Sequence, residues 1–107
     1  MKKVKVKIDR PLHSMHPKHN DLVYELNYGY VEGVIAPDGE EQDCYVMGVD
    51  EPITEYEGYV IAVIKRFDDV EEKWVIANRD FSIEEIRNKT HFQEQYFKIK
   101  IIKMEEK

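Results

Sequence analysis

The sequence has a single cysteine, Cys44, which excludes any disulfide within the chain. A lone thiol is typical of proteins in a reducing compartment. Long apolar segments are also missing. No run approaches the roughly 18 residues of a membrane span, and the first residues lack the apolar centre of a signal peptide. We therefore expect a cytoplasmic protein with no membrane partner.

Basic residues are scarce as well. Sixteen Lys and Arg stand against twenty-two Asp and Glu, which gives a net charge of −6. Proteins that bind the backbone of nucleic acids are usually basic, so nucleic acid is not an expected partner. A small anionic ligand in a locally basic pocket is compatible with this composition. The length of 107 residues corresponds to one domain, residues 1–107, and the hydrophobic fraction of 42% is enough for a modest core.

Short apolar segments with strand character make up most of the chain. Residues 3–9 alternate between polar and apolar side chains, as in a half-buried strand, and residues 58–67 contain a continuous apolar run typical of a buried one. Further extended segments are predicted at 22–26, 31–36, 44–49, 73–77 and 98–104. Many strands with one late helix indicate an α+β domain that is mainly β, built on a small barrel. Periodicity alone does not select which barrel.

One helix is predicted after residue 81. Ser82 and Glu85 have the spacing of a capping box, which places the helix start at Ser82. A second pair with this spacing, Thr90 and Gln93, predicts a break near Asn88 and a fresh turn after it. The expected element is therefore one broken C-terminal helix.

The stretch 27–43, NYGYVEGVIAPDGEEQD, places four carboxylates in and after a turn, at Asp38, Glu40, Glu41 and Asp43. The Asp-Gly step predicts a tight turn that leads into the strand from Cys44. Carboxylates are hard oxygen ligands, and Mg²⁺ needs only a few of them because it keeps several waters. The alternative interpretation is a solvated surface turn, since charge-rich turns are common.

This stretch resembles the signature of family I soluble inorganic pyrophosphatases, an acidic turn of the form D-x-D-P-x-D shortly after Y-G-Y. Tyr28-Gly29-Tyr30 and Asp38-Gly39-Glu40-Glu41-Gln42-Asp43 carry the resemblance, with Glu40 for the second aspartate and Glu41 for the proline. The similarity extends over about residues 24–96. It implies an OB-like five-stranded β-barrel. It also implies hydrolysis of pyrophosphate with Mg²⁺, or with Mn²⁺ in its place, and allows a homo-oligomer.

The resemblance also implies roles for individual residues. The expected metal ligands are the turn carboxylates and two acidic residues of a later loop, namely Asp38, Glu40, Asp43, Asp68 and Glu71. The expected substrate contacts are Arg10, Tyr24, Tyr28, Lys73 and Tyr96, the last from a stretch similar to the family's H-F-x-E-x-Y-K. The expected catalytic residues are Asp43, Glu40, Lys73 and Tyr28.

The chain departs from the family pattern at several points. Bacterial members are longer and begin with a hairpin that supplies a metal glutamate and a phosphate lysine, whereas no glutamate precedes Glu25 here. Phe97 stands where the family has lysine. Glu40 replaces the aspartate that orients the attacking water, and misplacement by about an ångström can cost a factor of roughly 100 in rate.

Two hypotheses follow from this comparison. The chain is either a reduced but active pyrophosphatase or a catalytically degenerate module that binds a phosphorylated ligand or a protein partner. Hydrolysis of another phosphoanhydride is a third possibility. Each set of candidate site residues also has a purely structural interpretation. The tyrosines can simply pack in a core, Lys73 can be solvated, and residues 68–72 can form a plain surface turn.

Two further features are expected to lie outside the site. His13, His16 and His19 belong to a loop in which Pro17 opposes the helix that would align them, so a transition-metal site is not favoured. Cys44 follows Asp43 on a strand and is expected to face the opposite way, into the core.

Overall fold

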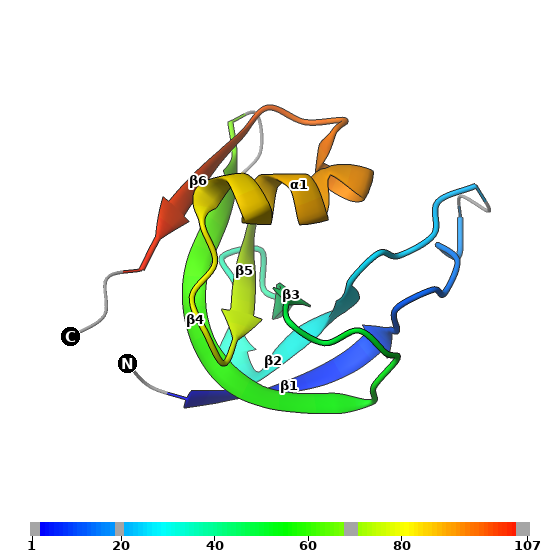
Figure 1. Ribbon diagram of the computed structural model, residues 1–107. Coiled ribbons are helices and arrows are strands. Elements are labelled where there is room, and N and C mark those ends of the chain that lie inside the picture. The colour runs from blue at the N-terminus through cyan, green and yellow to red at the C-terminus, as the bar shows by residue number, and fades with distance from the viewer. Residues whose placement is uncertain (1–2, 19–20, 68–70, 105–107) are drawn as a thin grey trace.

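The computed structural model of the protein describes residues 3–18, 21–67 and 71–104. Figure 1 shows a curved sheet that wraps around the core, with one helix across its upper end. The described residues form six strands and one helix, in the chain order β1 (Lys3–Arg10), β2 (Asn27–Ile35), β3 (Glu41–Val46), β4 (Glu55–Arg66), β5 (Glu72–Ala77), α1 (Ile83–Glu94) and β6 (Ile99–Lys103).

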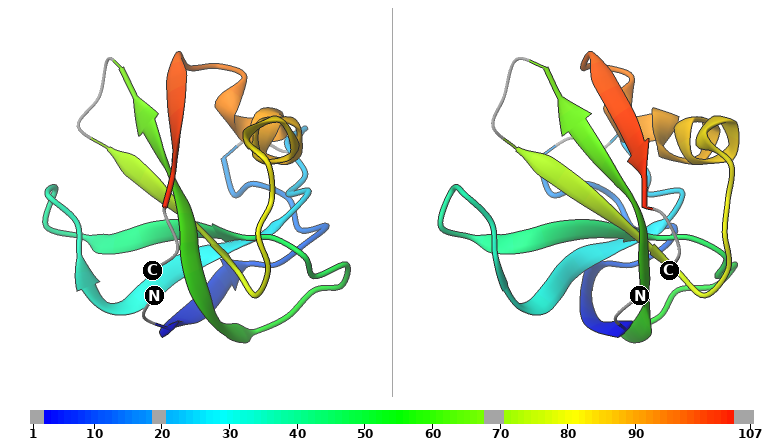
Figure 2. Two further views of the ribbon diagram at one scale, coloured as in Figure 1. Left: turned by 60° about the vertical axis from the view of Figure 1, so that its left-hand side comes forward. Right: turned by 90° about the vertical axis from the view of Figure 1, so that its left-hand side faces the viewer.

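Five of the strands close into a barrel. The sheet order is β1-β2-β3-β5-β4-β6, and β4 also pairs with β1, so that the ring closes and β6 extends it from β4. The β3–β5 pair is parallel, whereas the other ladders are antiparallel. The two turned views in Figure 2 show the strands crossing at the closure, with α1 beside β6. The predicted α+β fold with a small OB-like barrel is confirmed.

The strands bury apolar side chains on both of their faces. One cluster lies under α1 and includes Tyr45, Ile64 and Val75 from the strands with Ile86 and Phe92 from the helix. The other, on the opposite face, is formed by Val6, Val31, Cys44, Val46 and Ile76. Because side chains alternate along a strand, Cys44 and Asp43 point to different faces, and Cys44 is fully buried as predicted.

The segment predicted as a strand at 22–26 is not part of the barrel. Residues 11–18 and 21–26 lie against each other as an arm, in which the N–H of His13 donates to the carbonyl of Tyr24 at 2.8 Å and Met15 bridges Val23. The buried side chain of Asn27 fixes the base of this arm, because its Oδ1 accepts the N–H of Leu12 at 2.9 Å. The segment is therefore extended as its apolar pattern predicts, but it pairs within the arm and not with a strand of the barrel. The segment predicted at 31–36 is the second half of the longer strand β2.

The helix begins as predicted, and the prediction of a break is wrong. Ser82 caps α1, with its hydroxyl accepting the N–H of Glu85 while the Glu85 carboxylate accepts the N–H of Ser82. The helix then continues without interruption to Glu94. The Thr90 hydroxyl donates to the carbonyl of Ile86 one turn earlier, so Thr90 is an interior residue instead of a cap. No helix in the described part of the chain is long and apolar enough to cross a membrane.

A β-bulge sets the end of β1. Ile8 pairs with Gly29 and Arg10 with Tyr28, so Asp9 is an extra residue on β1. Bulges bend a strand and redirect its side chains. As a consequence Asp9 and Arg10, although adjacent in sequence, both line the cavity described below.

Close approach of β1 to β2 depends on Gly29, because a Cβ at this position would lie 1.9 Å from the carbonyl oxygen of Lys7. We predict that Gly29→Ala lowers the free energy of unfolding by about 2–3 kcal/mol, since the two strands would have to separate. Urea denaturation measures this change. Glu32→Ala, an exposed position on the same strand, is the control and should change it by less than about 0.5 kcal/mol. Equal stability of the two variants would contradict the prediction.

Candidate active site

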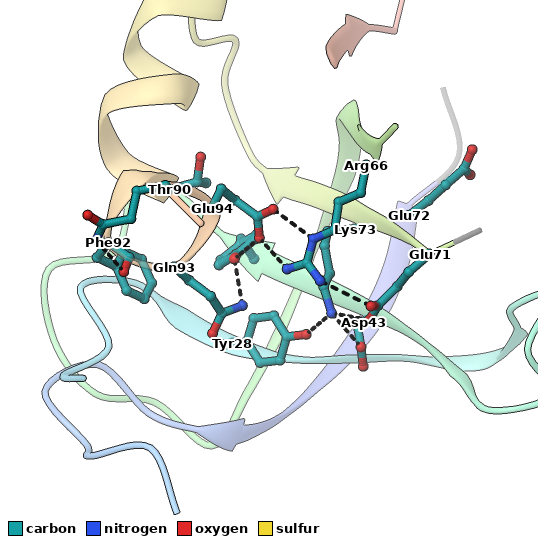
Figure 3. A network of polar contacts seen from close by, with 12 residues as sticks. Tyr28, Asp43, Arg66, Glu71, Glu72, Lys73, Thr90, Phe92, Gln93 and Glu94 are labelled. Carbon is teal, nitrogen blue, oxygen red and sulfur yellow. Dashed lines mark hydrogen bonds and ion pairs between the residues drawn. The ribbon is translucent and has the colours of Figure 1, made fainter. Parts of the chain in front are cut away.

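A buried lysine lies at the centre of the site. The Lys73 ammonium donates to the Tyr28 hydroxyl at 2.6 Å, to Asp43 Oδ2 at 2.8 Å and to Glu71 Oε1. Its side chain is only 5% exposed. All three ammonium donors are therefore used inside the protein, as Figure 3 shows. The alternative of a solvated lysine is excluded.

Barrel topology brings these groups together from distant parts of the sequence. Tyr28, Asp43 and Lys73 lie on β2, β3 and β5, which are neighbours in the ring. Because Cys44 pairs with Trp74, the preceding residues Asp43 and Lys73 lie side by side. The two-residue period turns their side chains toward the face that α1 covers.

A second buried cation, Arg66, stands beside Lys73. Its guanidinium binds Glu94 through two hydrogen bonds, Nε to Oε1 at 3.0 Å and Nη2 to Oε2 at 2.9 Å, and reaches Glu71 Oε2 through Nη1 at 3.1 Å. The guanidinium also lies 3.7 Å from the centre of the Phe97 ring. Glu71 thus bridges the two cations.

Burial alone would lower the pKa of Arg66, but the hydrogen bonds and charges of Glu94 and Glu71 outweigh it and raise the pKa above its usual value. Sequence reasoning missed this residue. The available signal was that Arg66 ends the apolar run of β4 at a position that alternates with the buried Ala62 and Ile64.

Glu94 ties the helix to the barrel. It is 2% exposed and accepts a hydrogen bond from the Tyr45 hydroxyl at 2.6 Å, in addition to its pair with Arg66. Gln93 donates to the same hydroxyl at 2.8 Å. Burial, followed by the charge of Glu94, raises the pKa of Tyr45 well above its usual range, so this phenol stays protonated.

A cavity of about 670 Å³ opens beside these groups. Its charged lining combines the cations Arg10, Arg66 and Lys73 with the carboxylates Asp9, Asp21 and Asp43. The remaining wall is largely aromatic or apolar and consists of His16, Leu22, Tyr24, Tyr28, Gln93, Tyr96 and Phe97. Three cations and three carboxylates share this lining, so an anionic ligand would depend on direct contact with individual cations and not on an excess of positive charge.

Tyr28 and Tyr24, in the wall of the cavity, keep their protons at neutral pH. Burial, followed by the charge of Asp43, raises the pKa of Tyr28 far above its usual range. Burial also raises the pKa of Tyr24, whose ring centre lies 5.6 Å from that of Tyr28. Tyr96 differs from both, because it is 71% exposed at the rim and does not pack in the core.

The structure brings most of the expected site residues to this cavity. Tyr28, Asp43, Glu71 and Lys73 are in direct contact. Arg10, Tyr24 and Tyr96 line the same space.

The acidic turn stands slightly apart. Asp38 lines a small neighbouring hollow together with Asp43 and Glu71, and the further carboxylates there are Glu41 and Glu72, which sequence reasoning left out. Glu40 is exposed, and its N–H donates to Asp38 Oδ1 at 3.0 Å. Asp68 and His19 lie outside the described residues, and His13 is exposed in the arm.

The donor chemistry around the small hollow fits a hard cation, because every ionisable group there is a carboxylate. The positions of these carboxylates fit a metal ion less well than their chemistry does. Among the described residues, no three His, Cys, Asp or Glu side chains converge as they would around a metal ion. Asp43 and Glu71 instead share the Lys73 ammonium.

The fold is similar to those of several solved inorganic pyrophosphatases. The enzyme of Ehrlichia chaffeensis matches 92% of this chain and 83% of its own at a TM-score of 0.72 and 17% identity. The Helicobacter pylori enzyme matches 94% of this chain and 84% of its own, at a TM-score of 0.68 and 17% identity. The Coxiella burnetii enzyme matches 97% of this chain and 86% of its own, at a TM-score of 0.67 and 15% identity. No family model matches the sequence, and no curated protein does. At these identities the likeness establishes the fold alone.

The Arg66–Glu94 pair gives a direct test of the buried network. Glu94→Gln removes one of the two carboxylates that the Arg66 guanidinium contacts, at a site where the Glu94 side chain is 1% exposed. We predict a loss of about 3–5 kcal/mol in the free energy of unfolding, the range for breaking a buried pair. Glu72→Gln is the matched control, because its pair with Lys65 is half exposed and should cost less than about 1 kcal/mol. Urea denaturation of both variants decides the matter, and equal losses would contradict a buried network.

Proposed function

We propose that this protein hydrolyses inorganic pyrophosphate to two phosphates in a reaction that depends on Mg²⁺, or on Mn²⁺ in its place. The observation that carries the proposal is the contact of Lys73 with Tyr28, Asp43 and Glu71 beside a cavity that also holds Arg10 and Arg66. The pyrophosphatase fold supports it at the level of architecture.

The cations and hydroxyls of the cavity are the proposed phosphate contacts. Lys73 and Arg10 supply positive charge, and Tyr24, Tyr28 and Tyr96 supply hydroxyls that can donate to phosphate oxygens. Arg66 joins this set. All three donors of Lys73 are engaged by Tyr28, Asp43 and Glu71, so Lys73 would donate to phosphate where a metal ion takes its place at one of the carboxylates. Burial of Lys73 strengthens its effect on the charge that develops on the transferred phosphoryl group.

The carboxylates are the proposed metal ligands, from the turn Asp38, Glu40 and Asp43 and from the later loop Asp68 and Glu71. A bound divalent ion would supply positive charge and a water of lowered pKa. Lys73 contacts both Asp43 and Glu71, which supports their assignment to one metal site beside the proposed phosphate contacts. Glu40 is proposed to orient the attacking water, with Asp43 as the carboxylate fixed by a strand.

A second candidate function has its own support. The two best-placed carboxylates are paired with Lys73, and the described residues contain no ready group of three ligands for a metal. This arrangement favours a module that binds a phosphorylated ligand through the buried cations without turnover. The two candidates make different predictions about metal dependence.

The first prediction concerns the metal. Phosphate release from pyrophosphate is measured with Mg²⁺, with Mn²⁺ and with excess EDTA. We expect turnover with either ion and none in EDTA, because the attacking water needs a lowered pKa near neutral pH. Equal release in EDTA would contradict metal dependence. No release in any condition, together with a melting temperature that rises with pyrophosphate, would favour the binding module.

The second prediction concerns Asp43. Asp43→Asn keeps the shape and removes the charge, so turnover should fall by about 100-fold or more, the scale lost with a key electrostatic group. The fold should persist, because Lys73 retains Glu71 and Tyr28. Asp50→Asn, an exposed loop position away from the cavity, is the matched control and should leave turnover unchanged. Phosphate release and thermal melts are measured for both variants, and an Asp43→Asn variant with full turnover would remove Asp43 from the site.

A further inference from the structure

The cavity is larger than a diphosphate needs. Its volume of about 670 Å³ lies in the range of roughly 300–1,000 Å³ that encloses whole drug-sized ligands. Glu71 contacts both Lys73 and Arg66, so the two buried cations lie in one region of this space. A diphosphate bound there leaves the rest of the cavity to another chemical group.

A row of rings leads away from the buried lysine. The Lys73 ammonium lies 5.2 Å from the centre of the Tyr28 ring, which lies 5.6 Å from Tyr24, which in turn stacks on His16 at 6.1 Å and an interplanar angle of 10°. The inner rings are buried, whereas His16 is half-buried. The outer end of the row therefore presents a flat ring that a ligand can reach.

The arm that carries His16 adds two further groups to this end of the cavity. Leu22 is half-buried and apolar, and Asp21 is an exposed carboxylate. Free pyrophosphate has nothing to place against an aromatic ring or a leucine. A flat aromatic base gains stability on such a surface, and a carboxylate accepts hydrogen bonds from sugar hydroxyls.

We propose that the natural ligands of the site are phosphoanhydrides that carry a nucleoside, with the diphosphate at Lys73 and Arg66 and the base beside His16 and Leu22. This inference rests on the proposed function, because it uses the same phosphate contacts. For a nucleoside diphosphate, water adds to the terminal phosphorus and the bridging P–O bond breaks. The products are inorganic phosphate, the nucleoside monophosphate and one proton.

Two non-hydrolysable probes isolate the nucleoside contribution. Methylenediphosphonate carries the two phosphonates alone, and α,β-methylene-ADP carries the same unit with adenosine attached. The nucleotide analogue has one ionisable oxygen fewer, so its smaller negative charge weakens its attraction to the cations. Any gain in affinity therefore comes from the nucleoside. Calorimetric titration of the full chain with Mg²⁺ should give a Kd about tenfold lower for the nucleotide analogue.

A variant assigns that gain to the arm. His16→Ala should bring the two Kd values to within about twofold of each other, with that of methylenediphosphonate unchanged. Met15→Ala is the matched control, since this neighbour on the arm is 62% exposed and does not line the cavity, and it should keep the full difference. Thermal melts check that both variants fold.

The outcomes separate this inference from the proposed function. Equal Kd values for the two probes on the unaltered protein would overturn the inference, and so would a difference that survives His16→Ala. If pyrophosphate is hydrolysed in that case, the proposed function stands alone. A tenfold preference without phosphate release from pyrophosphate would support nucleotide binding and remove the hydrolase. Failure of both probes to bind would overturn the inference, and phosphate release from pyrophosphate would then decide the proposed function separately.

Discussion

The buried ammonium of Lys73 is the constraint on which the rest of this structure depends. A charge removed from water is stable only when its hydrogen bonds are satisfied by good partners. Here those partners are Tyr28, Asp43 and Glu71, and they come from separate segments of the chain. In the barrel β2, β3 and β5 are neighbours, and this order brings the three partners to one atom.

Glu71 extends this constraint to the helix. Its carboxylate contacts Lys73 on one side and Arg66 on the other, and Arg66 is held by Glu94 of α1. Polar contacts thereby connect the barrel and the helix across one wall of the cavity (Figure 3). Such a network is costly when incomplete, and no buried side-chain polar atom among the described residues lacks a partner. Satisfaction of the network keeps the cations rigidly in place beside a space open to ligand.

Sequence reasoning located the part of this site that lies in short motifs. Tyr28, Asp43 and Lys73 were identified from Y-G-Y, the acidic turn and the later acidic loop. A small barrel was expected from the number of short strands, and its OB-like type came from the same resemblance. The ion pair of Arg66 with Glu94 was missed, because it joins residues 28 positions apart and its signal exists only in the folded chain. Local patterns also misassigned Thr90, since a hydroxyl can either cap a helix or bond backward. They could not show that the extended residues 22–26 pair within the arm, because an apolar strand pattern does not specify its partner.

We propose above all that the cations around Lys73 hold a diphosphate beside the carboxylates of Asp43 and Glu71. A crystal structure of the protein with Mg²⁺ and imidodiphosphate, a non-hydrolysable analogue, tests this most directly. We predict phosphoryl oxygens within hydrogen-bond distance of Lys73 Nζ and of the Tyr28 hydroxyl, about 2.6–3.0 Å, with metal density at Asp43. Analogue density outside this cavity would contradict the claim. So would a structure in which Lys73 keeps its contacts to Asp43, Glu71 and Tyr28 and no analogue lies near it.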